Sequence, residues 1–156
     1  MSTFKQLKSD NNLNEIIKSA FNTDLQLSGS WGYTQESATI ITTSTVPLTQ
    51  TQHKFASMRA YTEMHMTLEE KERYSNINLN ELHREQIVLK NLIYDKVTYQ
   101  ITAMKEDLYS TFIQAYKQGY GKDDFDMTEH FSQRKKATLT RVAVHWFEVH
   151  QVVKAT

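Results

Sequence analysis

The first apolar positions of the chain recur with a helical period. The side chains of one predicted helix face, at spacings of three and four residues, are Leu13, Ile16, Ile17, Ala20 and Phe21. Asn12 precedes this stripe and Glu15 lies in the first turn, where the helix dipole favours a carboxylate. The pattern therefore predicts a helix over about residues 12–22.

The next stretch has the composition of a β-hairpin. Apolar residues such as Leu27 and Trp31 surround Gly29 and Gly32, and β-branched residues dominate 37–45. Because β-branched and aromatic side chains favour strands, we predict a hairpin that turns near residues 33–36. The Thr-, Ser- and Gln-rich tract 42–52 contains Pro47, which cannot donate to a central ladder, and is predicted to be a loop.

Residues 55–68 alternate between two kinds of side chain. One set of alternate positions is Ala56, Met58, Ala60, Thr62, Met64, Met66 and Leu68, and the other is Phe55, Ser57, Arg59, Tyr61, Glu63, His65 and Thr67. Ala and Met prefer helices, but a period of two favours a strand with one buried face. We therefore predict a strand over 55–68.

The remainder of the chain predicts six further segments. A charged turn occupies 69–73. Residues 74–94 allow either a helix or a strand: Ile77 and Leu79 alternate as in a strand, whereas a helix near 79–91 is favoured by the helical stripe of Leu79, Leu82, Gln86, Leu89 and Ile93. Alternation predicts a strand over 97–103. The helical period returns at Leu108, Phe112, Ala115 and Tyr116, and Gly119 is placed to end that helix. A short helix near 126–135 and a β-rich run over 137–153 follow.

Most consecutive strands in this order lack an intervening crossover helix. An α+β fold therefore fits best, with an antiparallel sheet of about five strands and helices packed on one face. The chain of 156 residues shows no internal repeat, and one globular domain over 1–156 is expected, because a chain of this length can bury its own core.

Composition excludes several classes of protein. Lys plus Arg and Asp plus Glu both number 18, so no global field attracts nucleic acid or an anionic membrane. The absence of Cys excludes disulfide scaffolds, thiol nucleophiles and Cys-based metal sites. No apolar run reaches the ~18 residues of a membrane span. Residues 1–8 lack the apolar core of a secretory signal, and a cytoplasmic location is expected.

The polar set of the predicted strand 55–68 is the best candidate for a functional site. At a period of two, Arg59, Tyr61, Glu63 and His65 would share one sheet face as a ligand-binding set. Glu63 and His65 are the catalytic candidates, because a carboxylate and an imidazole can exchange protons. A solvated outer face would have the same sequence, since antiparallel sheets commonly leave one face wet.

Metal and cofactor motifs are absent from the sequence, and neither group is expected. Glu148 and His150 would complete a metal site only if their strand lay beside Glu63 and His65. The acidic cluster Asp123, Asp124, Asp126, Glu129 and His130 lacks the positions of a calcium loop. Carboxylates at a helix start are expected from the dipole alone, so helix capping explains the cluster.

Two function classes remain. The first is a non-catalytic binding protein, such as an adaptor, inhibitor or accessory subunit, that engages a protein partner or a second copy of itself. Missing catalytic motifs, neutral charge and the eight Tyr and six Met residues favour it, because Tyr and Met are enriched at interfaces. The alternative is a small enzyme or ligand-binding domain with a pocket on the Arg59, Tyr61, Glu63 and His65 face.

Overall fold

The structure, a computed structural model, describes residues 4–8, 12–23 and 25–154 and contains both helices and strands. The helices are α1 (Leu13–Phe21), α2 (Leu48–Tyr61), α3 (Glu106–Gly119), α4 (Met127–Ala137) and α5 (His150–Lys154). The strands are β1 (Leu27–Gly29), β2 (Thr39–Ile41), β3 (Tyr74–Leu89), β4 (Leu92–Lys105) and β5 (Leu139–Glu148). This content confirms the α+β class.

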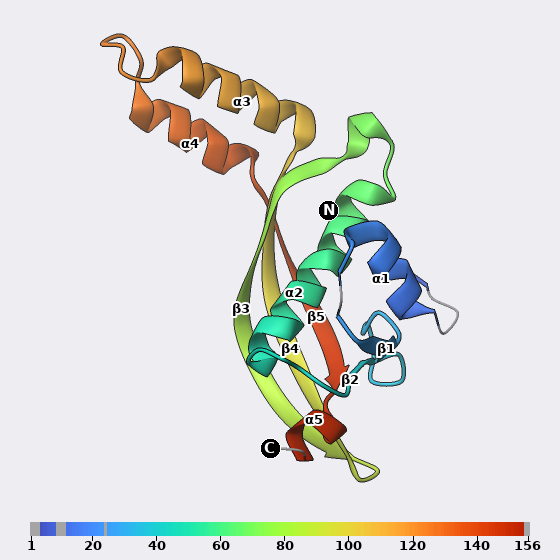
Figure 1. The fold of residues 1–156 in the computed structure, drawn as a ribbon. Coiled ribbons are helices and arrows are strands. Elements are labelled where there is room, and N and C mark those ends of the chain that lie inside the picture. Colours follow the sequence, from blue (N-terminus) through green and yellow to red (C-terminus); the bar gives the residue numbers. More distant parts are fainter. Residues whose placement is uncertain (1–3, 9–11, 24, 155–156) are drawn as a thin grey trace.

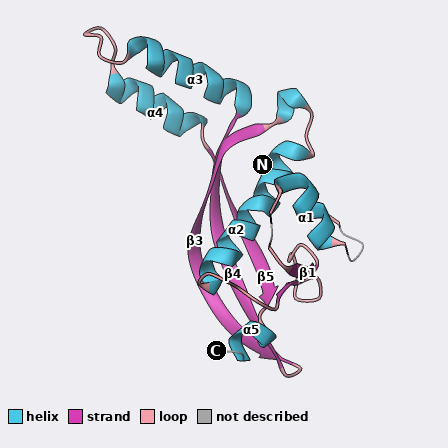
Figure 2. Ribbon diagram, viewed as in Figure 1, coloured by secondary structure: helices cyan, strands magenta, loops and turns pink. Residues whose placement is uncertain are grey.

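The five strands form a single sheet in the order β1-β2-β5-β4-β3. All neighbouring strands are antiparallel except β2 and β5, which run parallel, so the sheet is mixed. Helices α1 and α2 lie against one face of the curved sheet (Figure 1). Helices α3 and α4 form an antiparallel pair that stands off the end of β4 and β5, and we call this pair the arm (Figure 2).

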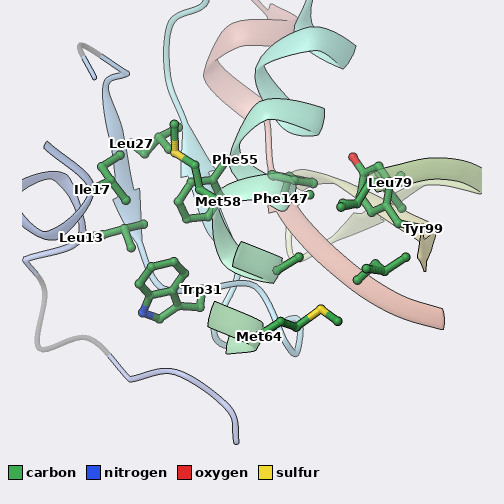
Figure 3. Packing of buried hydrophobic residues seen from close by; sticks show 14 of the residues in the cluster. Leu13, Ile17, Leu27, Trp31, Phe55, Met58, Met64, Leu79, Tyr99 and Phe147 are labelled. Carbon is green, nitrogen blue, oxygen red and sulfur yellow. The ribbon is translucent and has the colours of Figure 1, made fainter. Parts of the chain in front are cut away.

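The hydrophobic core lies between α1, α2 and the covered face of the sheet (Figure 3). Val97, Tyr99 and Ile101 are buried, whereas the intervening Thr98 and Gln100 on β4 are only partly buried. This alternation is what one covered and one wet face require. At the centre, the Trp31 indole stacks on the Phe55 ring with centroids 5.5 Å apart.

The predicted strand over 55–68 is wrong, because these residues continue α2. Helix α2 begins at Leu48, within the predicted loop, and a π-helical turn over Thr62–Met66 extends it. Besides Thr51 and Met58, its buried positions follow a helical stripe with spacings of three and four residues, namely Gln52, Phe55, Ala56, Arg59, Ala60, Glu63 and Met64. Three of these side chains, Gln52, Arg59 and Glu63, are polar or charged. A pattern based on apolar residues alone therefore does not show the stripe.

The predicted helix near 79–91 is also wrong, since these residues belong to the edge strand β3. Of the leucines that suggested the helix, Leu79 is buried while Leu82 and Leu89 are exposed. Strand β3 pairs along its length with β4, and the chain reverses between them at Lys90 and Asn91. Both turn residues have positive φ, which suits the twist of a two-residue hairpin.

The other predicted elements are confirmed. They are the helix over about 12–22, the hairpin formed by β1 and β2, the strand at 97–103 inside β4, both helices of the arm and the start of the last strand. The last strand ends at Glu148, and α5 follows it. No helix within the described ranges is long and apolar enough to cross a membrane.

Candidate functional site

The four side chains of the predicted site lie on α2 and its π-helical turn, so they do not share a sheet face. Helical spacing groups residues four apart. Arg59 and Glu63 therefore point into the core, where their exposed fractions are 3% and 2%. Tyr61 is exposed and His65 half-buried on another side of the helix. The predicted set thus divides into a buried charged pair and an outer aromatic pair.

Arg59 joins α2 to two distant segments. Its guanidinium donates to the Trp31 carbonyl oxygen at 3.2 Å and to the Val144 carbonyl oxygen at 2.9 Å. The same group lies over the Tyr33 ring, 4.5 Å from the centroid. Burial lowers the pKa of Arg59, and the Glu63 carboxylate opposes this effect. These contacts satisfy a cation that would otherwise be costly to bury.

Glu63 is the acceptor at the centre of the same buried cluster. The Tyr33 hydroxyl donates to Glu63 Oε2, and Arg141 donates to Glu63 Oε1 at 3.0 Å. Burial, with the nearby carboxylate, raises the pKa of the Tyr33 phenol well above its ordinary value, so the phenol stays protonated. The cluster holds α2 to the β1–β2 connection and to β5.

The described part of the N-terminal segment covers this cluster. The Leu7 amide donates to the Tyr33 hydroxyl oxygen at 3.0 Å. The Arg141 guanidinium lies over the Phe4 ring at 4.7 Å, and that ring meets the edge of Tyr74. Glu63 is therefore enclosed by protein groups, and its contacts are those of a structural ion pair.

Tyr61 and His65 form the outer pair. Their rings stack with centroids 4.7 Å apart, and Phe21 from α1 meets Tyr61 edge-on. The His65 Nδ1 lies 2.8 Å from the Tyr74 carbonyl oxygen and 3.3 Å from Glu106 Oε2. His65 therefore ties α2 to the beginning of β3 and of α3.

An open groove of about 710 Å³ lies between α1, α2 and β3. Phe21, Met58, Tyr61 and Ile77 line it with apolar surface, and polar residues at its rim include Glu81. Of the predicted residues, Tyr61 borders this groove. The groove could accept an apolar group. The predicted pocket was to be lined by all four residues of the set, but Arg59, Glu63 and His65 do not line this groove.

His145 is a buried imidazole on β5. The Thr39 hydroxyl donates to the Ser30 carbonyl oxygen at 2.7 Å and lies 2.9 Å from His145 Nε2. Because the Thr39 hydroxyl proton is donated to Ser30, the Thr39 oxygen is the acceptor in the second contact and the His145 Nε2–H group is the donor. His145 Nδ1 has no hydrogen-bond partner among the described residues. Burial, and secondarily Arg59, lowers the pKa of His145 well below 6.5.

We expect this imidazole to make the fold sensitive to mild acid. The pKa of His145 is lower in the folded protein than in the unfolded chain, where it is ~6.5. As the pH falls through ~6.5, the unfolded chain therefore binds a proton at His145 before the folded protein does. The free energy of unfolding should then fall below that pH by up to about 1.4 kcal/mol per unit. Urea denaturation of wild type and His145→Gln at pH 7.5, 6.5 and 5.5 measures this slope. Parallel slopes for the two proteins would contradict the expectation.

No group of metal-ligating side chains occurs within the part of the chain that the structure describes. Glu148 lies at the end of β5 beside β2, whereas Glu63 contacts Arg141 near the start of β5. These positions are separated by seven residues of strand, or roughly 23 Å at ~3.3 Å per residue. Asp126 caps α4 by accepting the Glu129 amide at 3.0 Å, as the predicted structural role of the acidic cluster requires.

The arm carries an aromatic surface, of which the sequence pattern indicated only Tyr116, as part of a helical stripe. Tyr116 contacts the Tyr120 ring at 5.4 Å and the Phe131 ring at 6.0 Å, which joins the two helices. The Arg134 guanidinium lies 5.4 Å over the Phe131 ring. We call these four residues the aromatic row. Tyr120 is 67% and Phe131 46% exposed, so much of the row faces solvent.

The interior of the arm is small. Gly119 is the buried residue of α3 and His130 that of α4. The His130 ring packs among Phe112, Tyr116 and Phe125 at 5.3 to 5.8 Å. Gly119 is required here, because an added Cβ would lie 2.3 Å from the Phe125 ring. The arm therefore has a defined shape although it buries little apolar surface.

Comparison with known proteins gives no assignment: no protein family, curated protein or solved structure matches this chain.

Proposed function

We propose that the chain is a non-catalytic binding protein, acting as an adaptor or accessory subunit that engages a protein partner through the arm. The observation that carries this proposal is the aromatic row, in which Tyr120 and Phe131 are exposed. The row belongs to a helix pair that stands off the sheet (Figure 1). Tyr and Arg are the residues that dominate binding energy at protein interfaces, and Phe adds apolar area. A projecting helix pair with this composition suits docking to a protein surface.

The alternative, a small enzyme or ligand-binding domain, receives less support from the geometry. Arg59 and Glu63 are enclosed by protein groups, and His65 contacts Tyr74 and Glu106. The groove beside Tyr61 has the volume of a small-ligand site, about 300–1,000 Å³. It is, however, an open groove whose lining includes neither Glu63 nor His65, so the predicted acid–base pair does not act there.

Site-specific crosslinking tests the proposal. The chain has no Cys, so a single introduced cysteine carries a photo-crosslinker at one defined position. Thr128→Cys places it one helical turn before Phe131, on the same side of α4. Ser57→Cys places it in the groove, and Glu36→Cys on an exposed loop provides a matched control. Each labelled variant is irradiated in extract of the source cell.

We expect discrete protein adducts from position 128 and none above background from position 36. Adding Tyr120→Ser and Phe131→Ser to the Thr128→Cys protein should abolish them, because both changes remove aromatic contact area. Adducts from position 57 alone would place the contact in the groove and overturn the arm as the interface. Equal background labelling at every position would overturn the proposed function itself.

A further inference from the structure

We propose that the partner bound by the arm is a second copy of this chain. We call the turn between α3 and α4 the tip of the arm, and the end that joins β4 and β5 its sheet end. In the dimer, the tip of each arm lies beside the sheet end of its partner's arm. The inference rests on the proposed function, and it adds the identity of the partner and its orientation. A two-fold axis crossing the arm near Phe131 produces this arrangement. Each copy then contributes the same surface, as a closed dimer requires.

The aromatic row is self-complementary under such an axis. Tyr120 follows α3 at the tip, whereas Arg134 lies toward the sheet end of α4, with Tyr116 and Phe131 between them. The two-fold axis makes the two arms antiparallel and so places Tyr120 opposite the partner's Arg134. The guanidinium and the face of the phenol ring attract each other. The two Phe131 rings approach each other near the axis, which removes their exposed apolar area from contact with water.

Charge along α4 favours the same orientation. The tip turn and the first turn of α4 carry Asp123, Asp124 and Asp126 beside a single cation, Lys122, and the helix ends in Arg134, Lys135 and Lys136. Lys135 is four residues after Phe131 and so lies on the side of the aromatic row. Tip-to-end pairing places the acidic turn of each copy beside the basic end of the other. Tip-to-tip pairing would place the acidic turns of the two copies against each other, and their repulsion disfavours that arrangement.

The charges used in this pairing are available for it. Asp123, Asp124, Lys135 and Lys136 are exposed, and none of them enters an ion pair within the described ranges. Helices α3 and α4 contain 14 and 11 residues. A two-fold contact uses one side of the arm and therefore only about half of these residues, fewer than the roughly 20–30 of a standard interface side, so the dimer belongs to the small, weakly bound class.

Charge reversal with a measured mass tests the orientation. The tip variant is Asp123→Lys with Asp124→Lys, and the end variant is Lys135→Glu with Lys136→Glu. Neither changes Asp126, so the α4 cap remains. We expect light scattering to give twice the chain mass of 18.2 kDa for wild type at low salt and the single-chain mass for each variant. The variant that combines all four changes should recover the dimer.

Tyr120→Ser with Phe131→Ser should raise the dimer dissociation constant at least about tenfold. Circular dichroism of every variant checks that the helices remain. A wild-type chain that stays monomeric at ~100 µM overturns the second copy as the occupant, while crosslinks from position 128 to a different protein would leave the proposed function standing. A dimer that survives Tyr120→Ser with Phe131→Ser overturns the arm as its interface. Failure of the four-change variant to dimerise overturns the tip-to-end orientation.

Discussion

Replacing Glu63 by lysine is expected to lower the free energy of unfolding by about 3–5 kcal/mol. Glu63 is 2% exposed, accepts from Tyr33 and Arg141, and lies four residues after the buried Arg59. The change removes the carboxylate that these donors need and adds a third cation to the cluster. Removing one partner of a buried ion pair leaves the other charge uncompensated, which is far more costly than losing a surface contact.

Equilibrium denaturation in urea measures this loss. Glu69→Lys is the matched control, because Glu69 is exposed on the following turn and should change stability by less than about 0.5 kcal/mol. Met64→Lys should be as damaging as Glu63→Lys, since a helix places both adjacent residues in the core. A mild effect of Glu63→Lys together with a severe effect of Met64→Lys is the result that a strand with one wet face would give. That result would contradict the helix.

Replacing Phe55 by alanine is expected to cost about 3–5 kcal/mol of stability. Phe55 is fully buried, stacks on Trp31 with centroids 5.5 Å apart and meets the edge of His145 at 5.5 Å. Truncation removes apolar burial and leaves a cavity between α2 and the sheet that these two rings cannot fill.

Phe131→Ala makes the same chemical change on the arm and provides the control. Phe131 is 46% exposed, so its truncation should cost about 1 kcal/mol or less. Urea denaturation should therefore show a lower midpoint for Phe55→Ala, with a similar slope in both variants. Equal losses would show that the core does not lie between α2 and the sheet. Because Phe131 belongs to the aromatic row, the same variant should weaken association more than folding.

Several elements could be predicted because their signals are local. The apolar stripe of α1 and the strict alternation of Val97, Tyr99 and Ile101 each identify one face of one element. The carboxylate of Asp126 caps the helix that it begins, and the helix period of α3 ends at Gly119. None of these signals depends on a residue far away in the chain, so the sequence was sufficient.

Helix α2 and strand β3 could not be assigned in this way. The stripe of α2 includes Gln52, Arg59 and Glu63, and these are tolerated in the core only because distant groups satisfy them. Gln52 donates to Asp95 at 2.8 Å, and Glu63 accepts from Arg141. In β3, the spacing of exposed leucines happened to match a helical period, but the hydrogen-bonded pairing with β4 determines that this segment is a strand.

The sequence alone was enough to predict the α+β class, the local elements with apolar periodicity and the two helices of the arm, of which Asp126 caps α4, because propensity, period and capping act within a few residues. The tertiary structure, by contrast, determines which polar residues are buried, since burial of Arg59 and Glu63 depends on partners more than 25 residues away in the chain, such as Tyr33 and Arg141. It also decided that Tyr116, Tyr120 and Phe131 meet in one exposed row. Their contact requires the turn between α3 and α4 to bring two helices together, which no single helical period specifies.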